Sequence, residues 1–262
     1  MKKKALFPIT LLIASISFQS FAQTELRETA RLKTSLILTM DGGTNGTSVA
    51  FNPLEKVYYT VIAGNESFPI EMFDQKGNSL SGTSAGIDVR GMWWNPKTKS
   101  LEANGYSELG YFRMDVNSEN ALQGTATELV SGMNQPSEQS VGAFDPTKQQ
   151  VHFYNEGVVS NYSLKDGKAG KKPLFLDIPV DLINLNSTTL IYTGIKGFEF
   201  GLLNYSDSEV LFFSRKGGKY AGSVVLPENA PVYDFFRFSF SNGLVWLFNA
   251  EGREWYGYEV FK

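Results

Sequence analysis

The chain lacks cysteine altogether and has one histidine, His152, among its 262 residues. The absence of cysteine excludes disulfides, cysteine-ligated zinc, iron–sulfur clusters and a cysteine nucleophile. A single histidine excludes any site that needs two or three imidazole ligands. After the first 22 residues, no apolar run approaches the length of a membrane-spanning helix. Carboxylates, bases, hydroxyls and aromatic rings are therefore the groups left for chemistry or binding.

The first 22 residues have the three parts of a secretory signal peptide. Three lysines at positions 2–4 precede a mostly apolar stretch over residues 5–18, and Ser20-Phe21-Ala22 places small residues where a signal peptidase reads them. We expect cleavage between Ala22 and Gln23. The alternative is an uncleaved membrane anchor, but the apolar run is short for a bilayer. With the lack of cysteine, the leader indicates an exported bacterial protein, periplasmic or extracellular.

The charge of the mature chain argues against two classes of partner. Removing the leader removes three lysines and no acid, which leaves 21 bases against 27 acids and a net charge of −6. Nucleic acids select basic surfaces, and so do anionic membranes. We therefore expect no nucleic-acid partner and no integral membrane segment after signal cleavage. A protein or a small molecule is the expected ligand.

The rest of the chain has the composition of an all-β protein. It contains 25 glycines, 20 phenylalanines and 12 tyrosines, and its short apolar runs end at Gly, Pro, Asn, Asp or Ser. Only residues 24–33 resemble a helix, with a thin apolar face, so we assign 23–34 to an N-terminal arm. Strands and helices do not alternate, which argues against a parallel α/β sheet. We expect a single β domain over residues 35–262.

A degenerate repeat organises this domain. Phe51-Asn52-Pro53 recurs as Trp94-Asn95-Pro96 and Phe144-Asp145-Pro146, and weaker copies lie at 200–205 and 237–242. Each copy ends a strand at a turn-forming polar residue, and a second strand follows. Successive anchors 43, 50, 59 and 38 residues apart are typical of β-propeller blades of three or four short antiparallel strands.

The number of blades depends on the longest interval. Residues 182–195 within it form either an embellished outer strand pair or a vestigial blade. Five blades are favoured and six are the alternative, with a β-sandwich as the competing architecture. The last copy lacks an outer strand, and residues 35–40 lack a partner, so we expect this N-terminal strand to close the ring and cover the exposed sheet edge.

These motifs resemble the NHL/YVTN-like β-propellers of exported bacterial proteins. The resemblance covers about residues 35–262 and implies architecture more than function, because such propellers include scaffolds, binding modules and lactonases. The metal-dependent lactonases of the group open with a Glu-Gly-Pro segment whose glutamate binds the ion. The corresponding stretch here, Thr47-Ser48-Val49-Ala50, has no glutamate.

Polar residues just before the inner strands are the candidate ligand-binding residues, because these strands converge on the mouth of the channel. They are Asp88, Arg90, Glu138, Glu199, Asp234 and Arg237. Asp88-Val89-Arg90 and Asp234-Phe235-Phe236-Arg237 put an acid and a base at matching points of two copies. The pairs either grip an anionic or sugar-like ligand or form salt bridges that seal the channel.

Three further features have weaker functional readings. The four acids among these residues could hold a calcium ion or another divalent ion only if all of them faced the axis. No calcium loop motif supports this arrangement, so we expect no cofactor. His152 has neither a carboxylate nor a nucleophile nearby in the sequence, which favours a core or blade-surface histidine. Trp93 and Trp94 are adjacent, so one of them must leave the face that the other occupies, and a ring spared from packing could stack on a sugar or peptide.

The sequence thus favours an exported, non-enzymatic propeller that binds a protein or small-molecule ligand at one mouth of its channel. A metal-dependent hydrolase or lactonase is the first alternative, and a structural module of an envelope complex is the second. No residue is assigned a catalytic role.

Overall fold

The computed structural model describes residues 24–64, 68–117 and 121–262. The predicted signal peptide lies outside these residues. The described chain is all-β, and its only helical element is a single 3₁₀ turn, η1 (Leu182–Asn184). In this part of the chain, no helix has the length and apolarity needed to cross a membrane.

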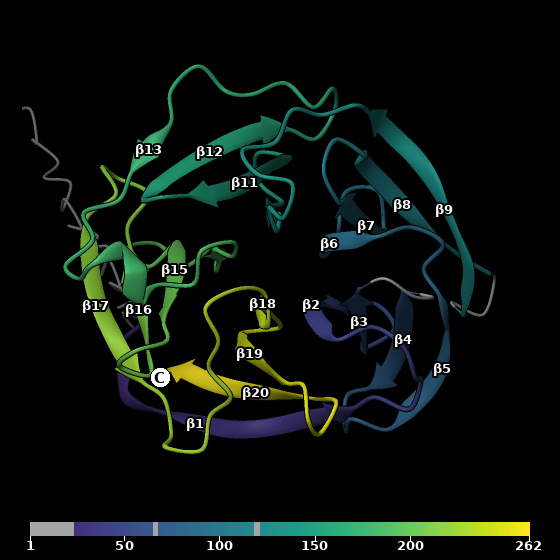
Figure 1. Ribbon diagram of the computed structural model, residues 1–262, viewed down its shortest axis with the longest axis horizontal. Coiled ribbons are helices and arrows are strands. Elements are labelled where there is room, and N and C mark those ends of the chain that lie inside the picture. Colours follow the sequence, from purple (N-terminus) through teal and green to yellow (C-terminus); the bar gives the residue numbers. More distant parts are fainter. Residues whose placement is uncertain (1–23, 65–67, 118–120) are drawn as a thin grey trace, which may run out of the picture.

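Four hydrogen-bonded sheets surround a common axis (Figure 1), and three of them are four-stranded antiparallel sheets. The first sheet contains β2 (Asn45–Asn52), β3 (Val57–Ala63), β4 (Pro69–Asp74) and β5 (Ser79–Ser84). The second contains β6 (Val89–Asn95), β7 (Ser100–Gly105), β8 (Gly110–Val116) and β9 (Leu122–Ser131). The third contains β10 (Ala143–Asp145), β11 (Gln150–Asn155), β12 (Val158–Ser163) and β13 (Leu174–Phe175).

The fourth sheet has eight strands. In spatial order it contains β14 (Ile191–Tyr192), β15 (Phe200–Asn204), β16 (Glu209–Phe213), β17 (Tyr220–Val225), β1 (Leu26–Ile37), β20 (Glu254–Phe261), β19 (Leu244–Asn249) and β18 (Phe238–Ser241). Its two halves, β14–β17 and β18–β20 with β1, meet where β1 and β17 pair in parallel at Thr29 and Val225. Each half repeats the inner-to-outer strand order of the other sheets, so the chain forms a propeller-like ring.

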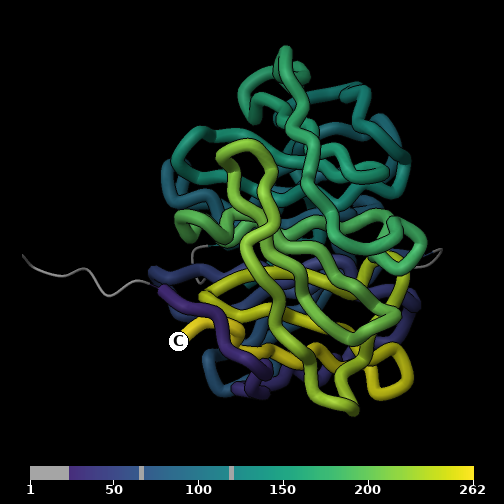
Figure 2. The backbone as a smooth tube through the Cα atoms, turned by 90° about the vertical axis from the view of Figure 1, so that its left-hand side faces the viewer, coloured from purple at the N-terminus to yellow at the C-terminus, as the bar shows by residue number. Residues whose placement is uncertain are grey.

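The N-terminal strand closes this ring, as the sequence predicts. β1 pairs antiparallel with the C-terminal strand β20, from Leu26–Phe261 to Ile37–Glu254, and Figure 2 shows the start of the described chain beside the C-terminus. Leu36 and Leu38 are buried with Trp246 and Trp255. Beyond the strand, the backbone N–H groups of residues 39 and 40 donate to the fully buried carboxylate of Glu71 on β4 at 2.9–3.1 Å. The closing segment is therefore bonded to both the last and the first sheet.

The closing strand is longer than predicted. It begins at Leu26, so residues 26–34 belong to the sheet and do not form a separate arm. Only Ala30 and Leu36 of this strand are buried, while Arg27 and Lys33 form ion pairs with Glu259 of β20 at 3.3 and 3.1 Å. Outer strands often carry charged side chains on their solvent face. These charges break the apolar alternation by which a strand is recognised in a sequence.

The sequence also places the fourth copy one strand too late. β15 is the second strand of its half-sheet, and the inner strand is the two-residue β14. Residues 182–195 therefore supply η1 and the inner strand β14, and not an outer strand pair. The cause is turn chemistry: Asn204 accepts a hydrogen bond from the N–H of Asp207 at 3.3 Å, and Ser208 is left-handed (φ 52°), while Lys56 after the Asn52 turn has φ 58°. Such a turn indicates that two strands form a hairpin, but it does not indicate whether they are the first and second or the second and third strands from the channel.

Side chains hold the inner strands side by side around the axis. Ser48 of β2 exchanges hydrogen bonds with the backbone of Met92 on β6 at 3.0–3.1 Å, and Ser239 of β18 accepts from the N–H of Val49 at 3.0 Å. A Cβ at Gly91 of β6 would lie 2.5 Å from the backbone N of Gly142, so only glycine allows this approach. The inner strands thus form a closed wall around a central channel.

Candidate functional site

A cavity of about 330 Å³ occupies the channel at the end of the ring where the inner strands terminate. Aromatic residues line it from each of the inner strands β2, β6, β10, β14 and β18, and β6 and β18 contribute two each. The aromatic residue nearest the end of each strand belongs to what we call the aromatic mouth: Phe51, Trp94, Phe144, Tyr192 and Phe240. With Tyr192 as the fourth member, successive residues are 43, 50, 48 and 48 positions apart, a more regular spacing than the predicted anchors have.

The adjacent tryptophans have different environments. Trp93 is buried, stacks on Phe144 at a ring-centroid distance of 5.4 Å and contacts the edge of Tyr111 at 6.0 Å. Trp94 is half-buried and lines the cavity, and within the described residues it has no aromatic partner and no hydrogen bond to its indole N–H. Trp94 is therefore the ring spared from packing, and its surface is available to a ligand.

The cavity wall is neutral. No charged side chain of the described residues lines it, and the hydroxyls of Ser48 and Ser239 are engaged by neighbouring backbone groups. Asn242 donates to the Tyr58 hydroxyl at 2.6 Å. In contrast, the buried Ser241 hydroxyl has no hydrogen-bond partner in this part of the chain. That hydroxyl is inaccessible to solvent, so the surface offered to a ligand is aromatic and uncharged, which suits an uncharged, largely apolar group.

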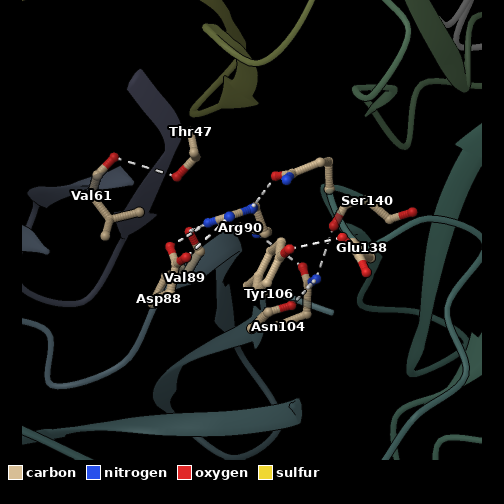
Figure 3. A network of polar contacts seen from close by, with 12 residues as sticks. Thr47, Val61, Asp88, Val89, Arg90, Asn104, Tyr106, Glu138 and Ser140 are labelled. Atoms are coloured by element: carbon tan, nitrogen blue, oxygen red, sulfur yellow. Dashed lines mark hydrogen bonds and ion pairs between the residues drawn. The ribbon is translucent and has the colours of Figure 1, made fainter. Parts of the chain in front are cut away.

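The predicted basic residues lie at the opposite end, where the inner strands begin. Arg90, at the start of β6, is 5% exposed. It makes two hydrogen bonds to the Asp88 carboxylate, and its Nε donates to the side-chain oxygen of Gln139 at 3.0 Å. The guanidinium also lies 4.7 Å from the ring centroid of Tyr106 and 5.4 Å from that of Phe236. The arrangement around Arg90 (Figure 3) therefore joins segments that precede several inner strands.

This network favours the sealing interpretation of Arg90 over ligand binding. Its charge is paired, its guanidinium lies over two aromatic rings, and little of it is accessible. Glu138 is exposed beside it and accepts a hydrogen bond from the Tyr106 hydroxyl at 2.7 Å, which raises the pKa of Tyr106. We name this end the polar mouth, with Arg90, Asp88 and Gln139 as its members.

Arg237 also reaches the polar mouth, but not beside Asp234 as predicted. Its Nη2 donates to the side-chain oxygen of Asn45 at 2.9 Å, and its guanidinium lies 3.8 Å from the ring centroid of Tyr233. Phe236 and Arg237 both have left-handed backbone angles (φ 48° and 56°), which turn the chain between the acid and the base. Asp234 remains exposed.

The four acids proposed for calcium do not converge. Glu199 precedes β15, which is not an inner strand, and it accepts hydrogen bonds from the N–H groups of Gly197 and Arg215 at 3.0 and 2.9 Å. Across residues 24–64, 68–117 and 121–262, no group of three or more Asp, Glu or His side chains could hold a metal ion. Asp88, Glu138, Glu199 and Asp234 therefore do not form the calcium site that their sequence positions left open, or the ligand set for a metal-dependent hydrolase.

His152 is a hydrogen-bonded core residue that contacts an ion pair. Arg215, in the turn after β16, donates from Nη2 both to Asp145 Oδ2 at 2.6 Å and to His152 Nε2 at 3.2 Å. Burial lowers the pKa of His152 to about 4, and the positive charge of Arg215 acts in the same direction. The sequence gives no sign of the role of Arg215, because it lies in an ordinary polar turn 63 residues from the histidine.

Neither family models nor curated proteins match the chain. Among solved structures, it is similar to the glutaminyl cyclase of Myxococcus xanthus, with a TM-score of 0.59 and 10% identity over 90% of this chain and 97% of that one. It is similar to a gluconolactonase of Xanthomonas campestris, with a TM-score of 0.51 and 10% identity over 88% and 96%. A Bacteroides thetaiotaomicron protein of unknown function gives 0.50 and 10% over 91% and 76%. At this identity the likeness concerns fold alone, and it confirms the predicted resemblance to β-propellers.

Proposed function

We propose that the protein is an exported, non-enzymatic five-bladed β-propeller that binds an uncharged, largely apolar part of a protein or small-molecule ligand in its aromatic mouth. The observation that carries the proposal is the cavity of about 330 Å³ with aromatic residues from each inner strand. Ligand sites are typically concave, mostly apolar, and provided with few polar groups. The aromatic mouth has this composition, whereas the polar mouth is filled by its own ion pair.

The count of five blades follows from treating the eight-stranded sheet as two blades. Its halves each contain four strands in inner-to-outer order, and they meet at the single parallel pair Thr29–Val225 between two outer strands. The regular spacing of the aromatic mouth supports the same division. A sixth blade would need a further inner strand, and residues 182–195 supply only β14, which belongs to the fourth blade.

The expected ligand chemistry follows from the uncommitted groups. Trp94 offers a free ring face, and stacking on an aromatic, prolyl or sugar ring uses such a face. Because the wall carries no charge, an ionised group in the cavity would lose its hydration without compensation. The ligand therefore inserts an uncharged ring.

Saturation-transfer NMR with three neutral probes tests the binding site: N-acetyl-tryptophanamide, N-acetyl-prolinamide and methyl β-glucoside. We expect at least one probe to bind, and Trp94→Ala to weaken that binding at least tenfold, since an exposed stacking ring is lost. Phe175→Ala removes an exposed ring (68% accessible) from the outer strand β13 and is the matched control. Failure of all three probes, or equal effects of the two substitutions, would contradict the proposal.

The export component rests on the leader alone. Intact-mass measurement of the protein recovered from a bacterial host should give a chain that begins at Gln23. A recovered chain that still begins at Met1 would refute export by cleavage, without bearing on the aromatic mouth.

A further inference from the structure

A second, smaller cleft lies outside the channel, between the third sheet and the β14–β17 half of the eight-stranded sheet. Its volume is about 130 Å³. The polar side chains that line it are Lys148, Gln150, His152, Asn161 and Arg215, and the apolar ones are Val159, Leu174 and Phe200. It shares no residue with the lining of the aromatic mouth. The cleft is therefore a separate cavity, although Tyr192 of the aromatic mouth lies 5.4 Å from the His152 ring and 5.0 Å from the Arg215 guanidinium.

His152 lines this cleft and carries a hydrogen-bond donor that no described residue uses. The guanidinium of Arg215 can only donate, so His152 Nε2 accepts and carries no proton. In a neutral imidazole the proton then resides on Nδ1, which makes Nδ1 a donor. Within the described chain Nδ1 has no hydrogen-bond partner, although the residue is only 4% exposed. Since His152 lines the cleft, an acceptor bound there is available to this donor.

The other polar side chains of the cleft also have groups without a hydrogen-bond or ion-pair partner among the described residues. The ammonium of Lys148 forms no ion pair, and the side-chain amides of Gln150 and Asn161 form no hydrogen bond, with any described residue. Arg215 uses Nη2 for Asp145 and His152, which leaves its Nη1 and Nε groups free. Donors from four segments of the chain thus converge on one small volume that contains no acceptor of negative charge.

The side chains that line the cleft include two cations and no acid. Two acids nevertheless contact Arg215: the fully buried Asp145 accepts from its Nη2 at 2.6 Å, and Glu199 accepts from its backbone N–H at 2.9 Å. Lys148 is the lining cation that forms no ion pair with a described residue. Its charge and the donors around it match an oxyanion, which accepts several hydrogen bonds at once.

We propose that this cleft binds a small oxyanion, the carboxylate or phosphate group of a soluble compound, through Lys148, His152, Asn161 and Arg215. Lys148 and Arg215 supply the charge, and His152 Nδ1 and the Asn161 amide supply directed hydrogen bonds. The apolar residues at the edge of the cleft leave room for the carbon skeleton that carries the anion.

Titration calorimetry on the mature chain at low ionic strength tests this with two probes, inorganic phosphate and acetate. We expect saturable binding of at least one of them at a single site. Lys148→Met removes one exposed charge and should weaken binding about ten- to hundredfold, the range for one charge-assisted hydrogen bond. Asn161→Asp keeps the shape but places a carboxylate in the cleft, and should abolish binding.

Lys97→Met is the matched control, because Lys97 is an exposed lysine in the equivalent turn of the preceding sheet. It should change the affinity less than twofold. Tighter binding of phosphate identifies a phosphoryl ligand, tighter binding of acetate a carboxylate, and both support the site. No saturable binding of either anion, or equal weakening by Lys97→Met and Lys148→Met, would overturn the proposal. Lys148 is exposed, so its variant remains informative even if Asn161→Asp does not fold.

Discussion

The stability of the fold should depend on pH through its single imidazole. His152 is 4% exposed, and burial followed by the charge of Arg215 lowers its pKa from the ordinary 6.5 to about 4. Asp145 opposes this shift and Lys148 adds to it, but both effects are smaller than desolvation. The folded state therefore holds His152 neutral under conditions in which the unfolded chain protonates it.

The sign and size of the effect follow by linkage. Since the folded pKa is depressed, the contribution of His152 is fully present above pH 6.5 and is lost as the pH falls from 6.5 towards 4. A difference of 2.5 pH units corresponds to about 3 kcal/mol lost by pH 4. This is a large fraction of the 5–15 kcal/mol that stabilises a typical domain.

Urea unfolding from pH 7.5 to 4 measures this loss, and His152→Gln is the reference. The variant has no titrating imidazole, so it should lack about 3 kcal/mol of the decline seen in the wild type over this window, while both share the titration of the carboxylates. Because the chain has one histidine, the imidazole NMR signal reports its pKa without assignment. A measured pKa near 6, or identical pH dependences of the two proteins, would show that His152 is hydrated and would refute the buried Asp145–Arg215–His152 cluster.

Two further predictions concern the polar mouth and the closing strand. Arg90→Ala leaves Asp88 and Gln139 without their partner and should lower the free energy of unfolding by about 3 kcal/mol in urea titrations, whereas exposed Arg113→Ala should cost under about 0.5 kcal/mol; equal stabilities would refute the sealing role. Deleting residues 24–40 removes the buried Leu36 and Leu38 and the donors of Glu71, and should cost at least about 3 kcal/mol in thermal or urea unfolding. Deleting only residues 24–33 should cost less than half as much, since that part of β1 buries little besides Ala30, and equal losses would mean that closure depends on the strand as a whole.

Local turn chemistry accounts for the parts of the fold that sequence analysis predicted. Asn52, Asn95 and Asp145 each accept a hydrogen bond from the N–H two residues later, at 2.9–3.0 Å, so the strand ends and their spacing can be derived from neighbouring residues. The closing strand was predictable because the last copy lacks an outer strand and the N-terminal strand lacks a partner. In both cases a short stretch of sequence is enough for the prediction.

The missed features depend on contacts that local patterns do not encode. The two residues of β14 are too few to show a period, and β14 is an inner strand only because β15 and the neighbouring inner strands flank it. Arg237 contacts Asn45 across 192 positions of sequence, and not the acid three residues before it. Ring closure brings such residues together, and the φ angles of a single turn decide which of them meet.

The choice of mouth shows the same limit for function. The charged residues before the inner strands were predicted to bind a ligand, because a charge inside a channel is costly unless it has a partner. In the structure the partners of Arg90 belong to the protein itself: Asp88, Gln139 and two aromatic rings. Trp93 and Trp94 are the same residue type in adjacent positions and both line the cavity, yet Trp93 stacks on Phe144 while Trp94 has no aromatic partner among the described residues. Successive side chains of a strand point to opposite faces, so only one of the two rings can enter the stack with Phe144 of the next sheet. Which one enters it is a property of the assembled ring rather than of any single repeat.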